Sequence, residues 1–283
     1  MKKLLCFGYG YVAQFLIQHN ATAQLDFSAT INRNKDIYFS EKQALEKINF
    51  AALTPKSLDN FEIFVISIPP FYEQKTDIIL EKFFNYFATR KQPYQLIYLS
   101  ATSVYGDQQN KKVAETAELK ATTSNGLARI ACEKKYLELT QNSAANIFIL
   151  RLAGIYGPKR NQLEKIQQGK KIAKFAADKI ISRIHVADIT NIILKLITQN
   201  KLSNEIFNLC DEQPSTSHEM LAYISQTFLA GETIAAEQFY ELSKNYSDAK
   251  IPDNQKLKQL LNYEFIYPNY KSGLKNCATH LDL

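Results

Sequence analysis

Two glycines near the amino terminus have the spacing of a phosphate-binding turn. The stretch LLCFGYGYVAQFLIQ contains Gly8-x-Gly10-x-x-Ala13, directly after an apolar strand-like run and at the start of a helix-like run. Gly8 permits the tight turn, Gly10 lets the backbone approach a pyrophosphate, and Ala13 allows close packing of helix on strand. The helix start, at Tyr11 and Val12, offers free N–H groups and a positive dipole end. The segment predicts a dinucleotide site; the alternative is a purely structural turn.

The end of the next apolar run bears on the choice of dinucleotide. An NAD site usually places Asp or Glu there to hold the ribose 2′-hydroxyl, whereas LDFSATI is followed by Asn32 and Arg33. The Arg33 guanidinium can pair with a 2′-phosphate. We therefore expect Asn32 and Arg33 to contact NADP, with NAD the less favoured cofactor. The alternative is that Arg33 is an ordinary solvated loop cation.

A polar and proline-rich step follows the apolar run at 63–68. Ser67 and Pro69 lie where a doubly wound sheet opens its ligand crevice. They are candidates for contact with the adenosine or ribose. A rigid turn that ends a strand fits the same residues equally well.

Strand-like and helix-like runs alternate through the first 150 residues. Strands are expected at 3–8, 25–31, 63–68, 96–100 and 147–152, and helices near 11–20, 75–90 and 125–141. This alternation predicts an α/β protein with a Rossmann-type doubly wound parallel sheet. A small C-terminal lobe is expected in addition.

The character of the chain changes after Pro158. A basic segment is followed by a strand at 180–184, a helix near 186–199, a strand at 205–210 and a helix near 217–229. We expect a Rossmann domain over 1–158 and mostly a second lobe over 159–283, which the family resemblance described below implies to be a substrate lobe. Within that lobe, 180–210 is expected to return to the Rossmann core.

Charge and composition exclude several classes of protein. The net charge is +6, no run of about 18 apolar residues exists, and the four cysteines are far apart. The four histidines have no metal-ligand spacing. We expect no membrane span, no metal site and a cytoplasmic protein.

Much of the positive charge lies in one segment, 159–179. It carries seven basic side chains, Lys159, Arg160, Lys165, Lys170, Lys171, Lys174 and Lys179, against only Glu164 and Asp178. Such a local cluster suits a small phosphorylated ligand better than a nucleic acid, and no nucleic-acid motif accompanies it. A solvated surface helix is the alternative.

Three further motifs, with the glycine turn, carry a family resemblance. LSATSVYGD (99–107), RLAGIYGP (151–158) and SRIHVADI (182–189) resemble the short-chain dehydrogenase/reductase superfamily, in particular its extended epimerase/dehydratase branch and the compact atypical members of that branch. The resemblance spans roughly residues 1–215. It implies an NAD(P)-binding Rossmann domain, a small substrate lobe, and homodimer contacts through the helices near 75–90 and 125–141.

The resemblance also implies a catalytic Ser/Thr and a Tyr-x-x-x-Lys pair. Ala101 stands at the Ser/Thr position, with Ser100 and Thr102 as neighbours, while Asn125 takes the tyrosine position and Arg129 the lysine position. An asparagine amide does not titrate near neutral pH, so Asn125 cannot exchange the proton. Arg129 can still bind ribose hydroxyls. Ser100 and Arg129 remain candidates for cofactor contact.

Substitute proton donors are available near the expected cleft. Tyr105, Tyr72, Tyr156 and Glu115 are the candidates, and Tyr105 with Thr102 is the pair we select. For each tyrosine the alternative is a packing role with its hydroxyl satisfied.

Five basic or titratable residues of the two later motifs and the basic segment are candidates for substrate contact. They are Arg151, Lys159, Arg160, Arg183 and His185. His185 titrates near neutrality and could act as a general base. A hydrogen-bonded scaffold role fits it as well.

Two functional hypotheses follow. The first is an atypical reductase or epimerase-like enzyme that acts on a nucleotide-linked or other anionic sugar with a non-standard proton donor. The second is a non-catalytic NADP-binding protein that senses cofactor redox state. The missing catalytic residues favour the second, and the basic segment favours the first.

Overall fold

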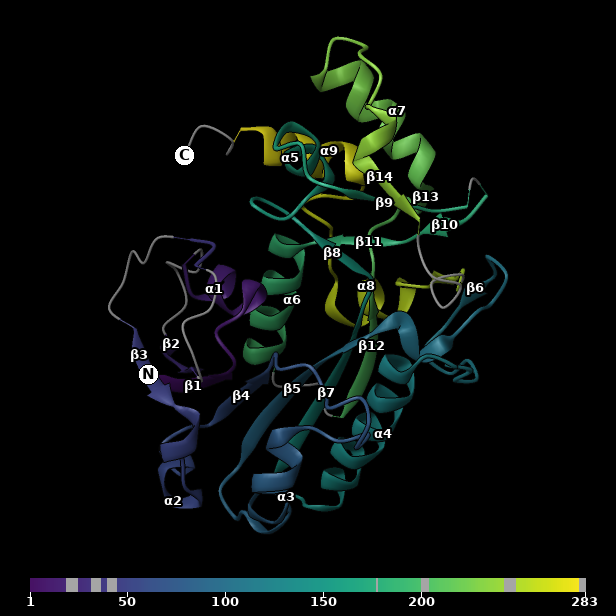
Figure 1. Cartoon of the computed structure of the whole chain (residues 1–283). Helices are drawn as coiled ribbons and strands as arrows, with labels where there is room; N and C mark the ends of the chain where they lie inside the picture. The colour runs from purple at the N-terminus through teal and green to yellow at the C-terminus, as the bar shows by residue number, and fades with distance from the viewer. Residues whose placement is uncertain are drawn as a thin grey trace. The chain divides into compact units, whose positions relative to one another are not determined.

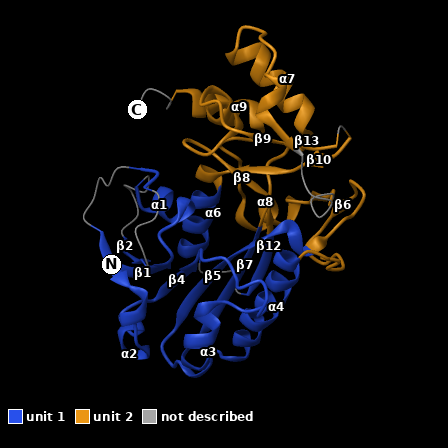
Figure 2. Ribbon diagram, viewed as in Figure 1, with its two compact units in different colours: residues 1–104, 124–151, 189–207 blue, residues 105–123, 152–188, 208–283 orange. Residues whose placement is uncertain are grey.

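The chain folds into two compact units. The computed structural model describes residues 1–18, 25–31, 37–39, 45–176, 178–199, 204–241 and 248–279. The first unit comprises 1–104, 124–151 and 189–207, and the second comprises 105–123, 152–188 and 208–283 (Figure 2). The division is thus more interleaved than a single boundary at residue 158. Residues 189–207, inside the expected 180–210 return, are part of the first unit.

A seven-stranded parallel sheet forms the centre of the first unit (Figure 1). Its order is β12 (Glu205–Leu209), β7 (Ala145–Leu152), β5 (Tyr94–Ala101), β4 (Ile63–Ile66), β1 (Lys2–Phe7), β2 (Leu25–Ile31) and β3 (Glu46–Asn49). The chain runs outward from β1 in both directions, which is the doubly wound arrangement. The expected Rossmann-type α/β fold is confirmed.

The central strands are apolar because both of their faces are covered. Every residue of β4 is buried, and so are the last four of β1, as is typical of parallel sheets between helices. The sequence did not predict β3, since Glu46–Asn49 is short and largely exposed and shows no apolar run.

The helices of this part of the chain are α1 (Tyr11–Gln18), α2 (Pro55–Leu58), α3 (Ile78–Thr89), α4 (Ser124–Glu138) and α6 (Val186–Thr198). All the expected helices are present, and α3 begins later than expected because Asp77 caps it. The Asp77 Oδ1 accepts the N–H groups of Ile79 and Leu80, both at 2.9 Å. No helix in the described ranges is long and apolar enough to cross a membrane.

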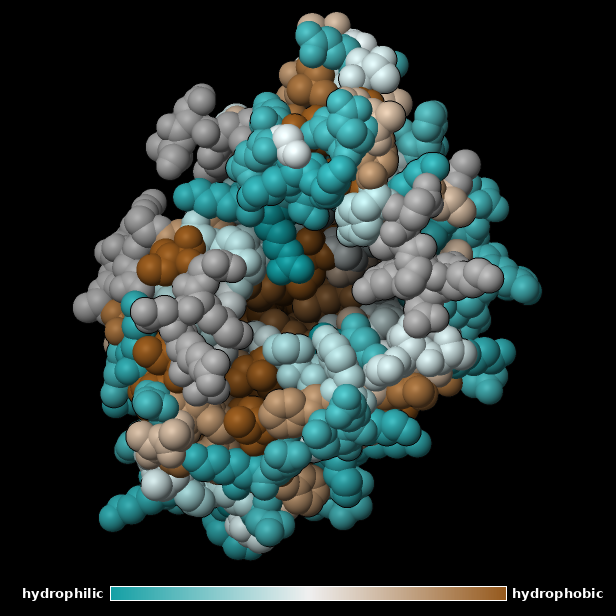
Figure 3. Space-filling model, viewed as in Figure 1, coloured by the Kyte–Doolittle hydropathy of each residue, from teal (hydrophilic) through white to brown (hydrophobic). Residues whose placement is uncertain are grey.

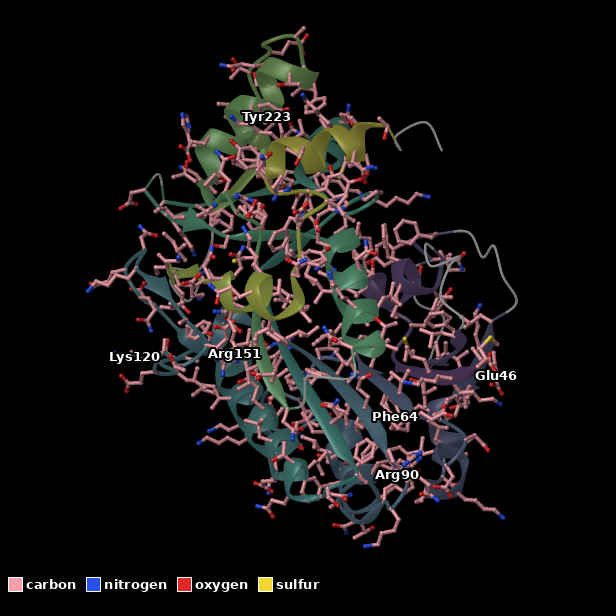
Figure 4. All side chains as sticks on the ribbon, turned by 180° about the vertical axis from the view of Figure 1, so that it is seen from behind. Glu46, Phe64, Arg90, Lys120, Arg151 and Tyr223 are labelled. Atoms are coloured by element: carbon pink, nitrogen blue, oxygen red, sulfur yellow. The ribbon has the colours of Figure 1, made fainter. Side chains whose placement is uncertain are left out.

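Aromatic side chains fill the core on one face of the sheet. Phe64 stacks with Phe7 at 6.1 Å and meets Phe87 edge-on at 5.0 Å between ring centroids. The Arg90 guanidinium lies 5.5 Å from the Phe64 ring centroid (Figure 4).

Hydrophilic side chains predominate on the surface where α2 and α3 lie (Figure 3).

Small strand pairs build the second unit. They are β8 (Gly154–Tyr156) with β11 (Arg183–His185), β10 (Ile180–Ile181) with β13 (Ser215–Thr216), β9 (Ile172–Lys174) with β14 (Phe239–Glu241), and β6 (Lys112–Val113) with β15 (Ile251–Pro252). Helices α5 (Gln162–Gln167), α7 (Ser217–Phe228), α8 (Gln255–Leu261) and α9 (Tyr270–Ala278) complete it. The single strand expected at 180–184 is therefore wrong in detail: it splits at Ser182, because β10 and β11 pair with different partners.

A buried ion pair joins α4 to the sheet. Glu133 on α4 is 2% exposed and Arg151 on β7 is 3% exposed (Figure 4). The Arg151 Nη2 donates to Glu133 Oε2 at 2.8 Å, and the Ser100 hydroxyl on β5 donates to Glu133 Oε1 at 2.6 Å. Because both charged groups are buried away from water, each is stabilised by the opposite charge of the other.

We predict that Glu133→Gln strongly destabilises the protein. The variant leaves the Arg151 guanidinium buried without a counter-charge, at a cost of about 3–5 kcal/mol in the free energy of unfolding. Glu138→Gln is the matched control on the same helix, because Glu138 pairs with Lys135 in solvent, and its cost should stay within about 0.5 kcal/mol. Urea unfolding measures both. Equal losses in the two variants would contradict the account.

Candidate functional site

The glycine turn is held by two side chains from neighbouring strands. The Gly8 N–H donates to Thr30 Oγ1 on β2 at 2.8 Å. The Ser67 hydroxyl, just after β4, lies 3.0 Å from the carbonyl oxygen of Phe7 and 3.1 Å from that of Gly8. Ser67 therefore stabilises the turn from the next strand, which is the structural role that its position also allowed.

The turn fits a dinucleotide pyrophosphate. Gly8 has φ +95°, and a Cβ there would lie 2.9 Å from Ile68 Cγ1, so only glycine is accommodated. A Cβ at Gly10 would meet nothing within 4 Å, which leaves open space beside the backbone at the start of α1. The first turn of α1 contains no acidic residue to repel an anion. These are the features that close approach of a phosphate requires.

The other candidates for cofactor contact vary in their placement. Tyr11 and Val12 are buried in the first turn of α1, and Pro69 is exposed in the segment that follows β4. Asn32 and Arg33 lie outside the described residues. The choice of NADP over NAD therefore stays a prediction from the sequence.

The residues at the tyrosine and lysine positions bind each other. The Arg129 Nε donates to Asn125 Oδ1 at 3.1 Å, and the Arg129 Nη1 donates to the Leu99 carbonyl at 3.0 Å. Ser100 is 2% exposed, and its hydroxyl donates to Glu133. The cofactor contact expected of Ser100 is thus not supported, because the hydroxyl is committed to the buried ion pair. Thr102 is half-buried at the start of the 3-10 turn Thr102–Tyr105.

Tyr105 is a buried packing residue. It is fully buried, and its hydroxyl donates to Asn208 Oδ1 at 2.7 Å. The Asn208 amide in turn donates to the carbonyls of Val113 and Asp253, both at 3.1 Å. The proton-donor role selected for Tyr105 does not fit this geometry, because its hydroxyl already serves a buried network.

The remaining substitute donors are in different environments. The Tyr156 hydroxyl donates to the Asn269 carbonyl at 3.3 Å, and burial raises the pKa of Tyr156 far above the working range of an acid catalyst. Glu115 accepts the N–H of Asn208 at 2.7 Å. Of the four candidates, Tyr72 alone is exposed, at 46%.

Two of the expected substrate contacts have structural roles instead. Arg151 is the buried partner of Glu133, and because its charge is already compensated this geometry does not favour the expected contact with substrate. His185 is fully buried, lies 4.0 Å from Tyr267 between ring centroids, and accepts the Ala187 N–H at Nδ1. This favours the scaffold role over the general base. Lys159 is exposed.

The second unit contains a cavity of about 260 Å³ that brings Arg160 and Arg183 together. Lys165 also lines it, as a third basic residue. The other lining residues come from β8, α5, the segment 175–181, α7 and α9: Gly154, Ile155, Tyr156, Asn161, Gln162, Phe175, Ile181, Ser217, Met220, Tyr270 and Leu274. No acidic residue lines this cavity within the described part of the chain.

Arg183 is the unusual member of this lining. It is 7% exposed, and its Nη1 donates to the Ile181 carbonyl at 3.0 Å and to Ser215 Oγ at 2.8 Å. Within the described ranges, its Nε and Nη2 have no hydrogen-bond acceptor and no carboxylate lies within ion-pair distance. Burial lowers the pKa of Arg183, yet a guanidinium stays protonated in proteins. Buried charges in proteins are as a rule paired, so an anion in the cavity would be favourable here.

The rest of the lining indicates what else a ligand would present. The Gln162 Oε1 is buried and has no hydrogen-bond partner among the described residues, so it can accept a donor. Met220, Leu274 and Phe175 provide an apolar wall.

The sequence predicted only part of this site, through the basic segment that contains Lys165. It gave no sign of Gln162 or Tyr270, which no motif marks. The described residues contain no cluster of three metal-ligating side chains.

Both the fold and the sequence are similar to those of known proteins. Residues 79–210 match the NAD dependent epimerase/dehydratase family. The chain is 28% identical to Protein YeeZ of Escherichia coli K12 over 182 residues, a match that covers 62% of this chain and only 59% of YeeZ.

Several solved structures match nearly the whole chain, including the following two. A conserved protein of unknown function from Silicibacter pomeroyi is 26% identical, with a TM-score of 0.82 and 99% of both chains covered. The UDP-glucuronic acid 4-epimerase of Bacillus cereus, solved with UDP-glucuronic acid and NAD, is 14% identical, with a TM-score of 0.80 and 99% of both chains covered, and shows a shared fold. The resemblance to the epimerase/dehydratase branch of the short-chain dehydrogenase/reductase superfamily, expected from the motifs, is therefore confirmed.

Proposed function

We propose that this protein binds a nicotinamide dinucleotide, preferably NADP, at the glycine turn and acts in an epimerase-like or reductase reaction on an anionic, nucleotide-linked sugar. The observation that carries the proposal is the buried Arg183 at the wall of a cavity that Arg160 and Lys165 also line. A dinucleotide supplies hydride chemistry when bound. The chain's own residues would bind and orient the two ligands.

The glycine turn supports the dinucleotide half of the proposal. Gly8 and Gly10 have the conformation and the open space that a pyrophosphate needs. The family is described as NAD dependent, and the Bacillus cereus epimerase was solved with NAD. The preference for NADP rests on the sequence alone, where Asn32 and Arg33 stand in place of the usual carboxylate.

The cavity supports the substrate half. Three basic side chains without an acidic one favour a phosphate or carboxylate group, and the free Gln162 Oε1 favours a hydroxyl or N–H beside it. At about 260 Å³ the cavity is small for a whole nucleotide sugar. It would hold one anionic end of such a ligand.

A second function has an observation of its own. Asn125 and Arg129, at the positions where the resemblance leads us to expect the proton-transfer pair, are hydrogen-bonded to each other. An amide and a guanidinium are not proton-transfer groups, so a protein that binds NADP without turnover and reports its redox state is the alternative. Measured product formation separates the two functions.

We predict opposite behaviour for two alanine substitutions in the turn. Gly8→Ala should destabilise the fold, because φ is +95° and the new Cβ meets Ile68 and Ser67. Gly10→Ala should leave the stability unchanged, because the space beside it is open, and should weaken dinucleotide binding by roughly tenfold or more. Thermal unfolding and calorimetric titration with NADP measure both effects. Unchanged NADP affinity in Gly10→Ala would argue against a pyrophosphate at this turn.

Arg33→Ala tests the choice of cofactor. Loss of a charge-assisted contact to the 2′-phosphate should lower the affinity for NADP by about tenfold to a hundredfold and leave that for NAD unchanged. Lys56→Ala removes an exposed cation of α2 as a control. Equal affinities of the unaltered protein for NADP and NAD would refute the preference.

Arg183→Gln tests the substrate site. With UDP-glucuronic acid as probe, Arg183→Gln and Arg160→Gln should each lower the affinity by about tenfold or more. Lys170→Gln removes a charge from the same segment outside the cavity lining and should have little effect. Absorbance at the reduced nicotinamide band and chromatography of the sugar products follow turnover. Equal losses in all three variants would indicate a diffuse basic surface instead of a site.

A further inference from the structure

Asp211 is a buried acid whose main chain is bound to that of Arg183. It follows β12 and is 3% exposed. Its N–H donates to the Arg183 carbonyl at 2.7 Å, and the Asn254 side-chain amide donates to the Asp211 carbonyl at 3.3 Å. The segment that carries Asp211 is therefore held directly beside the strand that carries Arg183.

The carboxyl group of Asp211 has too few donors for a stable anion. Its Oδ1 accepts only a long bond, 3.3 Å, from the Gln213 N–H. Its Oδ2 is buried and has no hydrogen-bond partner among the described residues. A carboxylate normally needs several donors when it leaves water, so this environment favours the neutral acid. Burial raises the pKa of Asp211 to about 8.

Other titratable groups face Asp211 from several elements. Arg183 on β11 is the cation among them and opposes the rise in the pKa, whereas Asp188 on α6 and the adjacent Glu212 add to it. Tyr156 on β8 and the neighbouring Cys210 also face it.

The two acids have donors of their own. Asp188 accepts the Tyr263 hydroxyl at 2.9 Å and the Ile266 N–H at 2.7 Å, and Glu212 pairs with Lys258. Glu219 on α7 also faces Arg183, but it is exposed to solvent and accepts the Thr216 N–H. Asp211 is thus the buried carboxyl whose proton decides whether Arg183 has a buried counter-charge.

We propose that Asp211 carries a proton near neutral pH and thereby leaves Arg183 without a counter-charge, so that the cavity binds an anion. The proposal rests on the proposed function only in taking this cavity as the anion site. A bound anion would in turn hold the proton on Asp211. Ionisation of Asp211 at higher pH would compensate the charge of Arg183. By linkage, it would lower the affinity of the cavity for the anion.

Sulfate is the suitable probe because it does not titrate over the range tested. Calorimetric titration of the whole protein should show that the affinity for sulfate is constant below pH 7 and falls by roughly tenfold between pH 7 and pH 9. Asp211→Asn should bind sulfate equally well at both pH values. Glu212→Gln, the matched control beside it, should keep the pH dependence.

Three results overturn the proposal. They are a pH-independent affinity in the unaltered protein, a pH dependence that persists in Asp211→Asn, and the absence of sulfate binding at either pH. Arg183→Gln distinguishes the two claims. If it binds sulfate normally, the cavity is not the site and the proposed function fails there. If it loses sulfate while the unaltered protein shows no pH dependence, only the role of Asp211 fails.

A second measurement does not depend on the folding of a variant. Infrared spectra of the unaltered protein between pH 6 and pH 10 should contain the carbonyl stretch of a protonated buried carboxyl that disappears above about pH 8. Added sulfate should move that loss to higher pH. A spectrum without such a band at pH 6 contradicts the proposal.

Discussion

A charge that leaves water must have a partner, and this constraint organises both units of the protein. In the first unit Arg151 and Glu133 compensate each other, and the Ser100 hydroxyl supplies a further donor. In the second unit Arg183 is almost as deeply buried, but its described surroundings contain no carboxylate within ion-pair distance. The first arrangement is complete and stabilises the fold. The second lacks such a close partner among the described residues, which is why a cavity beside Arg183 is informative.

The buried ion pair also determines where α4 holds the side chains of Arg129 and Asn125. Glu133 fixes the helix against β5 and β7, and Arg129 lies one turn earlier on the same helix. At that position Arg129 binds Asn125 and the Leu99 carbonyl. At this point the helix therefore presents an amide and a guanidinium that are hydrogen-bonded to each other.

Local patterns in the sequence predicted much of the fold and one of the two sites. The glycine motif lies within six consecutive residues, Gly8 to Ala13, so its chemistry was readable directly, and periodicity located α3, α4 and α6. Partners distant in sequence were not readable. Nothing near Arg151 marks Glu133 as its counter-ion, and nothing near Tyr105 marks Asn208 as its acceptor. The cavity likewise gathers Arg183 and Tyr270 from separate segments, which only the folded chain brings together.

The central claim is that the cavity beside Arg183 receives the anionic group of the substrate. A crystal structure of the protein with UDP-glucuronic acid tests it most directly. The account predicts a phosphate or carboxylate oxygen within about 3 Å of Arg183 Nε or Nη2, with Arg160 or Lys165 on the same group. A ligand bound with its anionic groups away from this cavity, and with the Arg183 surroundings unchanged, would contradict it.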